Sequence, residues 1–213
     1  HFPRALLHGS VALGGVGIPT LWAETLADKL SYFVYHMRVA DDVGQQLKVS
    51  TAITQLELGV GTPFFQLPYD TWGHLSTLSW VRHLWQSCSR ANVDVQAAAG
   101  AHWIPPLQTE SDLYIMELVM KRFSRKASIK LNHCRRYLQL VTVSDLYLHD
   151  GRCIHPDLYR GKPASGRLPQ YAWPDISPPS KSCWTLWKQF LRSEFVTSKH
   201  INAAEDVWCA LPT

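Results

Sequence analysis

Apolar residues at helical spacing are the feature that most constrains this chain. Trp22, Leu26, Leu30, Phe33 and Met37 follow one another at intervals of four, four, three and four residues. Side chains at these intervals share one face of an α-helix, so the segment predicts a long amphipathic helix with one buried side. Thr20, just before it, belongs to the residue types that cap helix N-termini.

Similar spacing recurs along the rest of the chain. Further helices are predicted to begin near Asp41 or Asp42, near Ser76 or Thr77, near Ser111 and near Ser182, with another after Ser124 that runs through Leu131 and Leu138. The predicted fold is therefore mainly α-helical, with one short β-hairpin and a Pro-rich C-terminal segment.

Turn and breaker residues divide the chain. The predicted parts are an irregular Gly-rich opening segment (1–19), a helical subdomain (20–140), a hairpin region (141–160), a Pro/Gly-rich linker (161–181), and a C-terminal helix with a tail (182–213). Asp150-Gly151, between two short alternating runs, is typical of a hairpin turn. Five prolines and two glycines in 161–181 disfavour regular structure there.

Tryptophan is abundant, with nine residues in 213. Large aromatic side chains can anchor a core, a partner groove or stacked bases. Trp22, Trp85, Trp184 and Trp187 fall on apolar helical faces. We therefore expect these four to pack in the core.

The run Val39-Ala40-Asp41-Asp42 invites comparison with the aromatic-Ala-Asp-Asp signature of reverse transcriptases, whose carboxylates bind two metal ions at a hairpin tip. Here the first position is Val, a helical pattern precedes the run, and Gly44-Gln45-Gln46 follows instead of an apolar strand. Because Asp is a preferred N-cap, we interpret these aspartates as a helix cap and predict no catalytic residue.

Other sites are disfavoured by spacing. The cysteines at positions 88, 134, 153, 183 and 209 form no CxxC pair, which argues against zinc fingers and knuckles. No serine stands in a strand-turn-helix elbow of the kind hydrolases use. We expect no metal or cofactor. No long apolar run predicts a membrane span, and no signal peptide opens the chain, so we expect an intracellular protein of the cytoplasm or nucleus.

The strongest local signal for function is a basic segment. Residues 118–144 contain no Asp or Glu, although the whole chain carries a net charge of only +4. The segment's cations are Lys121, Arg122, Arg125, Lys126, Lys130, Arg135 and Arg136. Such a segment favours phosphate contacts, and Tyr137 and His133 beside it are candidates to stack on or hydrogen-bond to bases. The alternative is a solvated helix face whose charge is balanced by acidic residues elsewhere.

Several sequence blocks resemble the region downstream of the catalytic palm in LINE-type (non-LTR) retrotransposon reverse transcriptases. The first is Gly14-Gly15-Val16-Gly17-Ile18-Pro19, which leads into a long apolar helix. The others follow in matching order: Gln55-Leu56-Glu57-Leu58-Gly59 with Thr62-Pro63-Phe64, Leu67-Pro68-Tyr69 with Ser79-Trp80 and Leu84-Trp85, Trp103-Ile104-Pro105-Pro106-Leu107-Gln108, Leu131 to Gln139, and Ser144-Asp145-Leu146 with Asp150-Gly151. The resemblance covers roughly residues 13 to 196.

This resemblance implies a thumb or C-terminal linker region that supports template RNA, target DNA or their hybrid. The chain contains no fingers-palm segment, catalytic triad, zinc knuckle or endonuclease motif, so none of those activities is carried over to its residues. Because the first residue is His rather than Met, we expect a longer parent polyprotein whose upstream polymerase domain is a partner. Two alternatives remain open: a helical protein–protein interaction module, and a decayed retroelement fragment.

The missing carboxylate triad generates a first prediction. The purified chain should extend no primer on an RNA or DNA template with magnesium or manganese, because two-metal chemistry needs converging carboxylates. The measurement is nucleotide incorporation by the parent chain and by Asp41→Ala. Metal-dependent incorporation that Asp41→Ala abolishes would overturn the interpretation of Asp41 as a helix cap.

Overall fold

The computed structural model describes residues 3–18, 20–96, 104–148, 153–163, 171–195 and 208–209, and its fold is mainly α-helical as predicted. The α-helices are α1 (Arg4–His8), α2 (Leu21–Val39), α3 (Asp42–Leu58), α4 (Tyr69–Trp72), α5 (Trp80–Ala91), α6 (Ile115–Arg122), α7 (Arg125–Tyr137), α8 (Pro156–Arg160) and α9 (Lys181–Phe195). The 3-10 turns are η1 (Val11–Leu13), η2 (Phe64–Gln66), η3 (Gly73–Leu75) and η4 (Ser144–Leu146), and the strands are β1 (Cys153–Ile154) and β2 (Trp208–Cys209).

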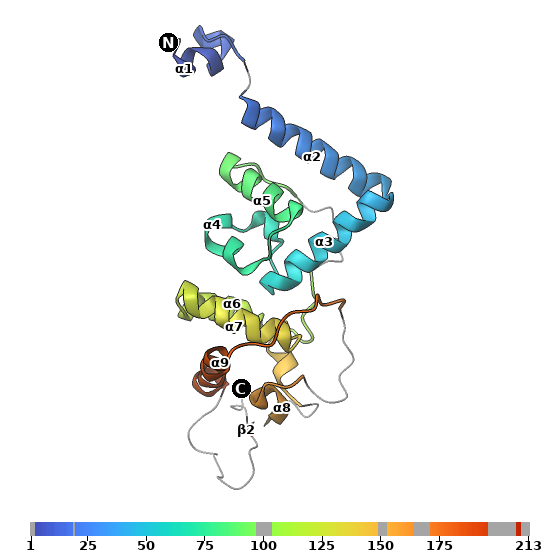
Figure 1. The fold of residues 1–213 in the computed structure, drawn as a ribbon, viewed down its shortest axis with the longest axis vertical. Coiled ribbons are helices and arrows are strands. Elements are labelled where there is room, and N and C mark those ends of the chain that lie inside the picture. The colour runs from blue at the N-terminus through green and yellow to red at the C-terminus, as the bar shows by residue number, and fades with distance from the viewer. Residues whose placement is uncertain are drawn as a thin grey trace.

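The described residues form an elongated molecule with α1 at one end and α8 and α9 at the other (Figure 1). α2 and α3 meet at an elbow, and α4 and α5 pack beside them as an upper group of helices. α6, α7 and α9 form a lower group. One hydrophobic cluster nevertheless extends from Leu26 on α2 to Phe195 on α9, so the two groups share a core.

The elbow between α2 and α3 confirms the helix-cap interpretation of Asp41. Ala40 has a left-handed backbone with φ of 56°, and the Oδ1 atom of Asp41 accepts a hydrogen bond from the Gly44 amide at 2.7 Å. The other carboxylate oxygen lies 2.7 Å from Nδ1 of His36. A side chain at Gly44 would collide with the His36 carbonyl, because its Cβ would lie 2.1 Å away. Glycine is therefore required for α3 to pass so close to α2.

The tryptophans follow the core prediction with one exception. Trp85 and Trp187 are fully buried, and Trp184 is partly buried against the same cluster. The prediction is wrong for Trp22, whose side chain is 47% exposed. Trp22 lies at the start of α2, which projects past α5 (Figure 1), and so it remains in contact with solvent. The buried hydrophobic residues of α2 are Leu26 and Phe33, farther along the helix.

The lower group of helices is built around α7 and α9. The predicted break near Ser124 is present, since α6 ends at Arg122 and α7 begins at Arg125. α9 packs along α7 and places Trp187, Phe190 and Leu191 in the common core. The C-terminal helix is thus integrated with the helical subdomain.

Arg135 links the two groups through the carbonyl end of α3. Its side chain is fully buried and donates from Nη2 to the carbonyls of Leu56 at 2.7 Å and Glu57 at 2.9 Å. Nη1 donates to the Leu140 carbonyl at 2.7 Å, and Nε donates to Oδ1 of Asn132 at 3.0 Å. The last carbonyls of a helix have no partner within the helix, so Arg135 supplies partners that water cannot supply in the interior.

The surrounding residues leave just enough room for this guanidinium. Gly59 ends α3 with φ of 63°, and a Cβ there would lie 2.5 Å from Nη1 of Arg135. Nδ2 of Asn132 donates to the carbonyls of Glu57 at 2.9 Å and Leu75 at 3.1 Å. Two α7 side chains therefore hold the C-terminal end of α3.

The hairpin prediction is confirmed in its paired part. The Leu148 amide donates to the Cys153 carbonyl at 2.8 Å, and the His155 amide donates to the Leu146 carbonyl at 2.9 Å. The expected turn at Asp150-Gly151 lies outside the described residues. β1 also pairs antiparallel with β2, a pairing that local sequence did not indicate.

The described end of the Pro-rich segment, residues 171–180, is irregular as expected but partly packed. Tyr171 and Trp173 lie against a small cluster formed by Leu56, Tyr114 and Val141. The Trp173 ring also faces the guanidinium of Arg135 at 5.6 Å. This stretch therefore covers the junction between α3 and α7 instead of acting only as a spacer.

The junction generates a second prediction. Arg135→Met should lower the free energy of unfolding by about 3 kcal/mol, because the buried carbonyls of Leu56 and Leu140 lose the donor that Arg135 supplies and that of Glu57 keeps only Asn132. Lys130→Met, an exposed change on the same helix, is the matched control and should stay within about 0.5 kcal/mol of the parent. Urea denaturation measures both. A loss below about 1 kcal/mol for Arg135→Met would contradict the linking role.

Candidate nucleic-acid interface

The α6–α7 turn presents most of the predicted basic residues to solvent. Lys121 and Arg122 end α6, Arg125 and Lys126 begin α7, and Lys130 follows one turn later. All five are exposed. Lys126 and Lys130 are four residues apart and so share one face of α7. We call these five residues the α6–α7 basic surface.

The beginning of α7 has an electrostatic arrangement that favours an anion. Helix N-termini carry partial positive charge and unpaired amides, so acidic residues usually stand there. The first turn of α7 contains no acidic residue, and the side chain of Ser124 does not cap it. Arg125 and Lys126 add positive charge at the same end. A phosphate group would be stabilised there by the helix dipole and by both cations.

Ion pairs within the chain neutralise only part of the positive charge of the α6–α7 basic surface. Arg122 forms an ion pair with Glu194 of α9, and the hydrogen bond that its guanidinium donates to that carboxylate is the main cause of its raised pKa. The side chain of Arg122 is still 58% exposed. Within the described part of the chain, no ion pair involves Lys121, Arg125, Lys126 or Lys130.

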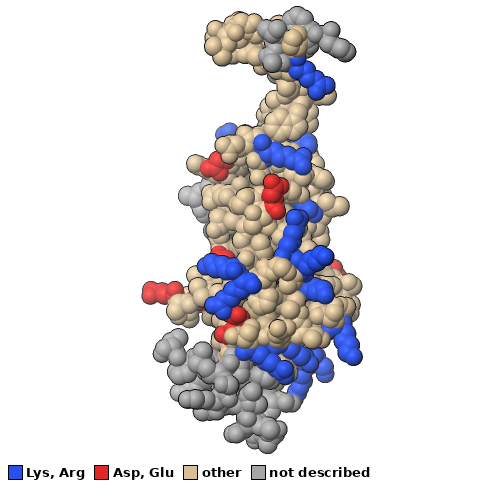
Figure 2. All heavy atoms as spheres, turned by 90° about the vertical axis from the view of Figure 1, so that its left-hand side faces the viewer, with Lys and Arg blue, Asp and Glu red and all other residues tan. Residues whose placement is uncertain are grey.

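Figure 2 shows the edge of the molecule that lies on the left in Figure 1. Lys and Arg side chains spread over the middle and lower parts of this face, with a few Asp and Glu side chains among them. The face is thus predominantly basic where α6, α7 and α9 lie. An extended polyanion such as a nucleic-acid strand suits a surface of this kind.

The prediction that Arg135 and Arg136 contact phosphates fails in the structure. Arg135 is fully buried at the end of α3, where no phosphate can reach it. Burial lowers its pKa to about 9, and the neighbouring charge of Arg136 acts in the same direction. Arg136 has a side chain only 12% exposed, and it pairs with the buried carboxylate of Glu57 at 2.6 Å. That carboxylate also accepts hydrogen bonds from the amide and hydroxyl of Thr77, so the pair belongs to the fold.

The two candidate base-contacting side chains also have structural partners. The Tyr137 ring is partly buried and packs edge-on against Trp184 of α9, with ring centroids 5.9 Å apart. Nε2 of His133 lies 2.8 Å from the Ser177 carbonyl and so holds the irregular segment against α7. These contacts leave both side chains poorly placed to stack on bases.

His74 lies close enough to the α6–α7 basic surface to be influenced by its charge. Burial is the main cause of its lowered pKa, and the charge of Arg125 acts in the same direction. Both ring nitrogens are buried. Burial and the charge of Arg125 thus both favour the neutral imidazole.

The sequence did not indicate which acidic residues pair with the cations of the basic segment. Glu57 lies on α3 and Glu194 on α9, 79 and 72 residues from Arg136 and Arg122. No local pattern connects residues so far apart. The described residues contain no group of three or more side chains able to hold a metal ion, and no described helix is long and apolar enough to cross a bilayer.

Comparison of the chain with protein-family models, curated proteins and solved structures finds no match. The geometry of the described residues is therefore the basis for assigning a function.

The packing of Tyr137 generates a third prediction. Tyr137→Ala should lower the free energy of unfolding by about 2 kcal/mol through lost packing against Trp184. It should leave the RNA affinity of the folded protein unchanged, because the ring is engaged with Trp184 of α9. Tyr35→Ala, at a position 60% exposed on α2, is the control and should change neither quantity. Thermal melts and binding titrations separate the effects, and weaker RNA binding by a fully folded Tyr137→Ala would restore the stacking role.

Proposed function

We propose that this chain is a non-catalytic nucleic-acid-binding region of a LINE-type reverse transcriptase polyprotein, supporting template RNA, target DNA or their hybrid during RNA-directed DNA synthesis. The observation that carries the proposal is the α6–α7 basic surface, five exposed cations around one turn at a helix N-terminus that has no acidic residue. The ordered sequence blocks that resemble this family support the proposed parentage. The proposed role places the chain inside the cell, with the polymerase domain of the same polyprotein as a partner.

Binding through this surface is expected to be independent of sequence. Lys and Arg contacts to phosphates release counterions, which makes affinity fall steeply with salt but carries no information about bases. The two aromatic candidates for base contacts are engaged within the fold. The proposed role is thus to hold a strand in place and not to select it.

A second candidate function, a protein-interaction module, is favoured by exposed apolar side chains on α2. Trp22, Tyr35 and Val39 are 47%, 60% and 54% exposed, and Leu21 is 80% exposed. Apolar residues grouped on one exposed helix commonly mark contact surfaces. A partner of this kind would bind at the upper end of the molecule in Figure 1, away from the α6–α7 basic surface.

A salt titration tests the proposed function and supplies a fourth prediction. Poly(U) RNA should bind the parent chain with an affinity that falls linearly with salt on a log–log plot. Replacing two cations by Arg125→Gln and Lys126→Gln should lower the slope by about 1.4, about 0.7 per lost contact on a single strand. Changing the sequence of the RNA should have little effect.

The control removes the same charge from another place. Arg38→Gln with Lys48→Gln alters two exposed cations on α2 and α3 and should retain the parent slope. Equal slopes for both double variants would show that net charge, and not this surface, determines binding. No affinity of the parent for RNA, DNA or hybrid at low salt would reject the proposal in favour of the interaction module.

A further inference from the structure

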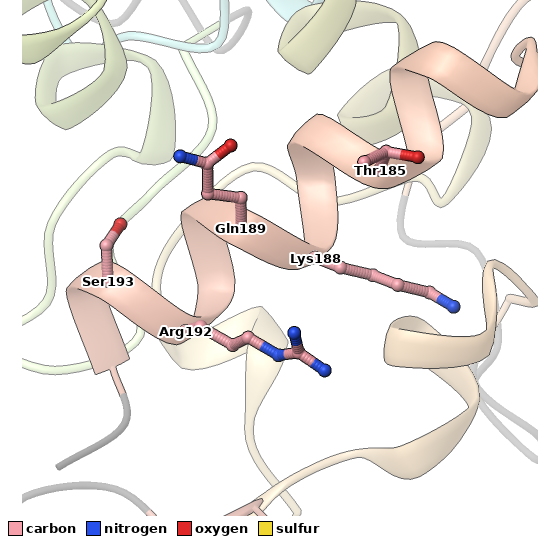
Figure 3. A pocket seen from close by; sticks show the side chains of 5 residues that line it. All are labelled: Thr185, Lys188, Gln189, Arg192 and Ser193. Atoms are coloured by element: carbon pink, nitrogen blue, oxygen red, sulfur yellow. The ribbon is translucent and has the colours of Figure 1, made fainter. Parts of the chain in front are cut away.

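Two long helices, α9 and α2, differ in the chemistry of their outward faces. The outward face of α9 is polar, and its two cations lie against the ring of Tyr159 on α8, at 5.0 and 5.5 Å from the ring centroid. The outward face of α2 is largely apolar, and no described element covers it (Figure 1). The α9 face consists of Thr185, Lys188, Gln189, Arg192 and Ser193 (Figure 3). The α2 face is therefore the one that needs a partner from outside the described chain.

The outward face of α2 has the spacing of a coiled coil. Its residues recur at alternating intervals of four and three, as side chains do along the seam between two paired helices. All six are exposed, and four of them are large apolar or aromatic side chains. We call them the α2 seam: Leu21, Thr25, Asp28, Tyr32, Tyr35 and Val39. This spacing indicates that the covering element is another helix.

Charges beside the α2 seam make the helix complementary to a reversed copy of itself. Glu24 and Arg38 lie on the same flank of the seam, seven residues before and seven residues after Ser31. Within the part of the chain that the structure describes, no ion pair involves either side chain. When a second α2 is reversed about its middle, Glu24 of each copy meets Arg38 of the other, so the pair forms twice. The same reversal places Leu21 against Val39 at both ends of the seam.

The centre of the α2 seam is balanced in the same way. Reversal brings Asp28 of one copy opposite Tyr32 of the other, and a tyrosine hydroxyl can donate to a carboxylate. The Tyr32 ring is positioned by an edge-on contact with Trp80 of α5, with ring centroids 5.7 Å apart. Lys29, next to Asp28, brings one positive charge per copy to the same level. Equal numbers of opposite charges therefore meet at the two-fold axis.

We infer that α2 is a dimerisation helix, whose seam packs antiparallel against α2 of a second copy of this chain. A two-fold interface requires that each residue of a contacting pair meets its counterpart in the other copy, and the matched positions of Glu24 and Arg38 satisfy this requirement. The inference specifies a partner for the apolar side chains of α2 and does not depend on nucleic-acid binding. One helix per copy makes a small interface, so association is expected at micromolar concentrations or above. Melts and RNA titrations in more dilute solution therefore report the monomer.

Charge reversal in the full chain tests this pairing by sedimentation equilibrium and supplies a fifth prediction. The parent should approach twice its monomer mass as its concentration rises. Glu24→Arg and Arg38→Glu should each weaken association about tenfold, because each dimer then contains two like-charge contacts. An equal mixture of the two variants should associate like the parent, because every contact then joins opposite charges. Lys48→Glu, which reverses an exposed cation on α3, is the control and should keep the parent association.

The outcomes separate this inference from the proposed function. A parent chain that stays monomeric at every concentration overturns the inference and leaves α2 to a different partner. A dimer that neither variant weakens lies on another face, and a mixture that associates no better than the single variants rejects the antiparallel pairing. Circular dichroism confirms that each variant is folded, and the double variant Glu24→Arg with Arg38→Glu should associate like the parent. Dilute poly(U) titrations of the same variants should keep the parent slope, so loss of dimerisation is measured apart from loss of RNA binding.

Discussion

The packing of Arg135 against the carbonyl end of α3 is the interaction on which the rest of the structure depends. A helix that ends inside a protein leaves carbonyl groups without partners, and burying them unpaired is costly. The guanidinium carries several donors in a fixed plane, so it satisfies α3 and the Leu140 carbonyl together. Because Arg135 belongs to α7, the same contacts orient the lower helices relative to the upper ones. Burial of this charge is tolerated because its donors meet carbonyl and amide oxygens.

This junction also determines which cations remain on the surface. α7 turns Arg135 and Arg136 inward to α3, and it leaves the cations of its first two turns outside. The result is a smaller basic surface than the sequence predicts, concentrated at the α6–α7 turn. α9 then adds Lys188 and Arg192 on a neighbouring surface. Positive charge is thus distributed over three helices that pack on one another, an arrangement suited to an extended polyanion.

The fold separates this basic edge from the apolar side chains exposed at the other end. α2 buries Leu26 and Phe33 but leaves Trp22 and Tyr35 in contact with solvent. The two ends therefore differ in the chemistry they offer a partner: exposed positive charge at the α6–α7 turn and exposed apolar side chains on α2. A polyprotein region that holds a strand while packing against a neighbouring domain would use both, whereas an interaction module would use the upper end alone.

Sequence by itself determined the helical class, the positions of most helices, the break near Ser124 and the capping role of Asp41, because these follow from short-range spacing and local hydrogen bonds. It also located the basic segment. It did not determine which of those cations face solvent, because the end of the distant helix α3 receives Arg135 at its carbonyls and Arg136 at the carboxylate of Glu57. Helical periodicity likewise places Trp22 on the apolar face of its helix, but it does not indicate whether another element covers that face. Only the tertiary structure decided these points, since burial and ion pairing depend on contacts between segments that the chain places far apart.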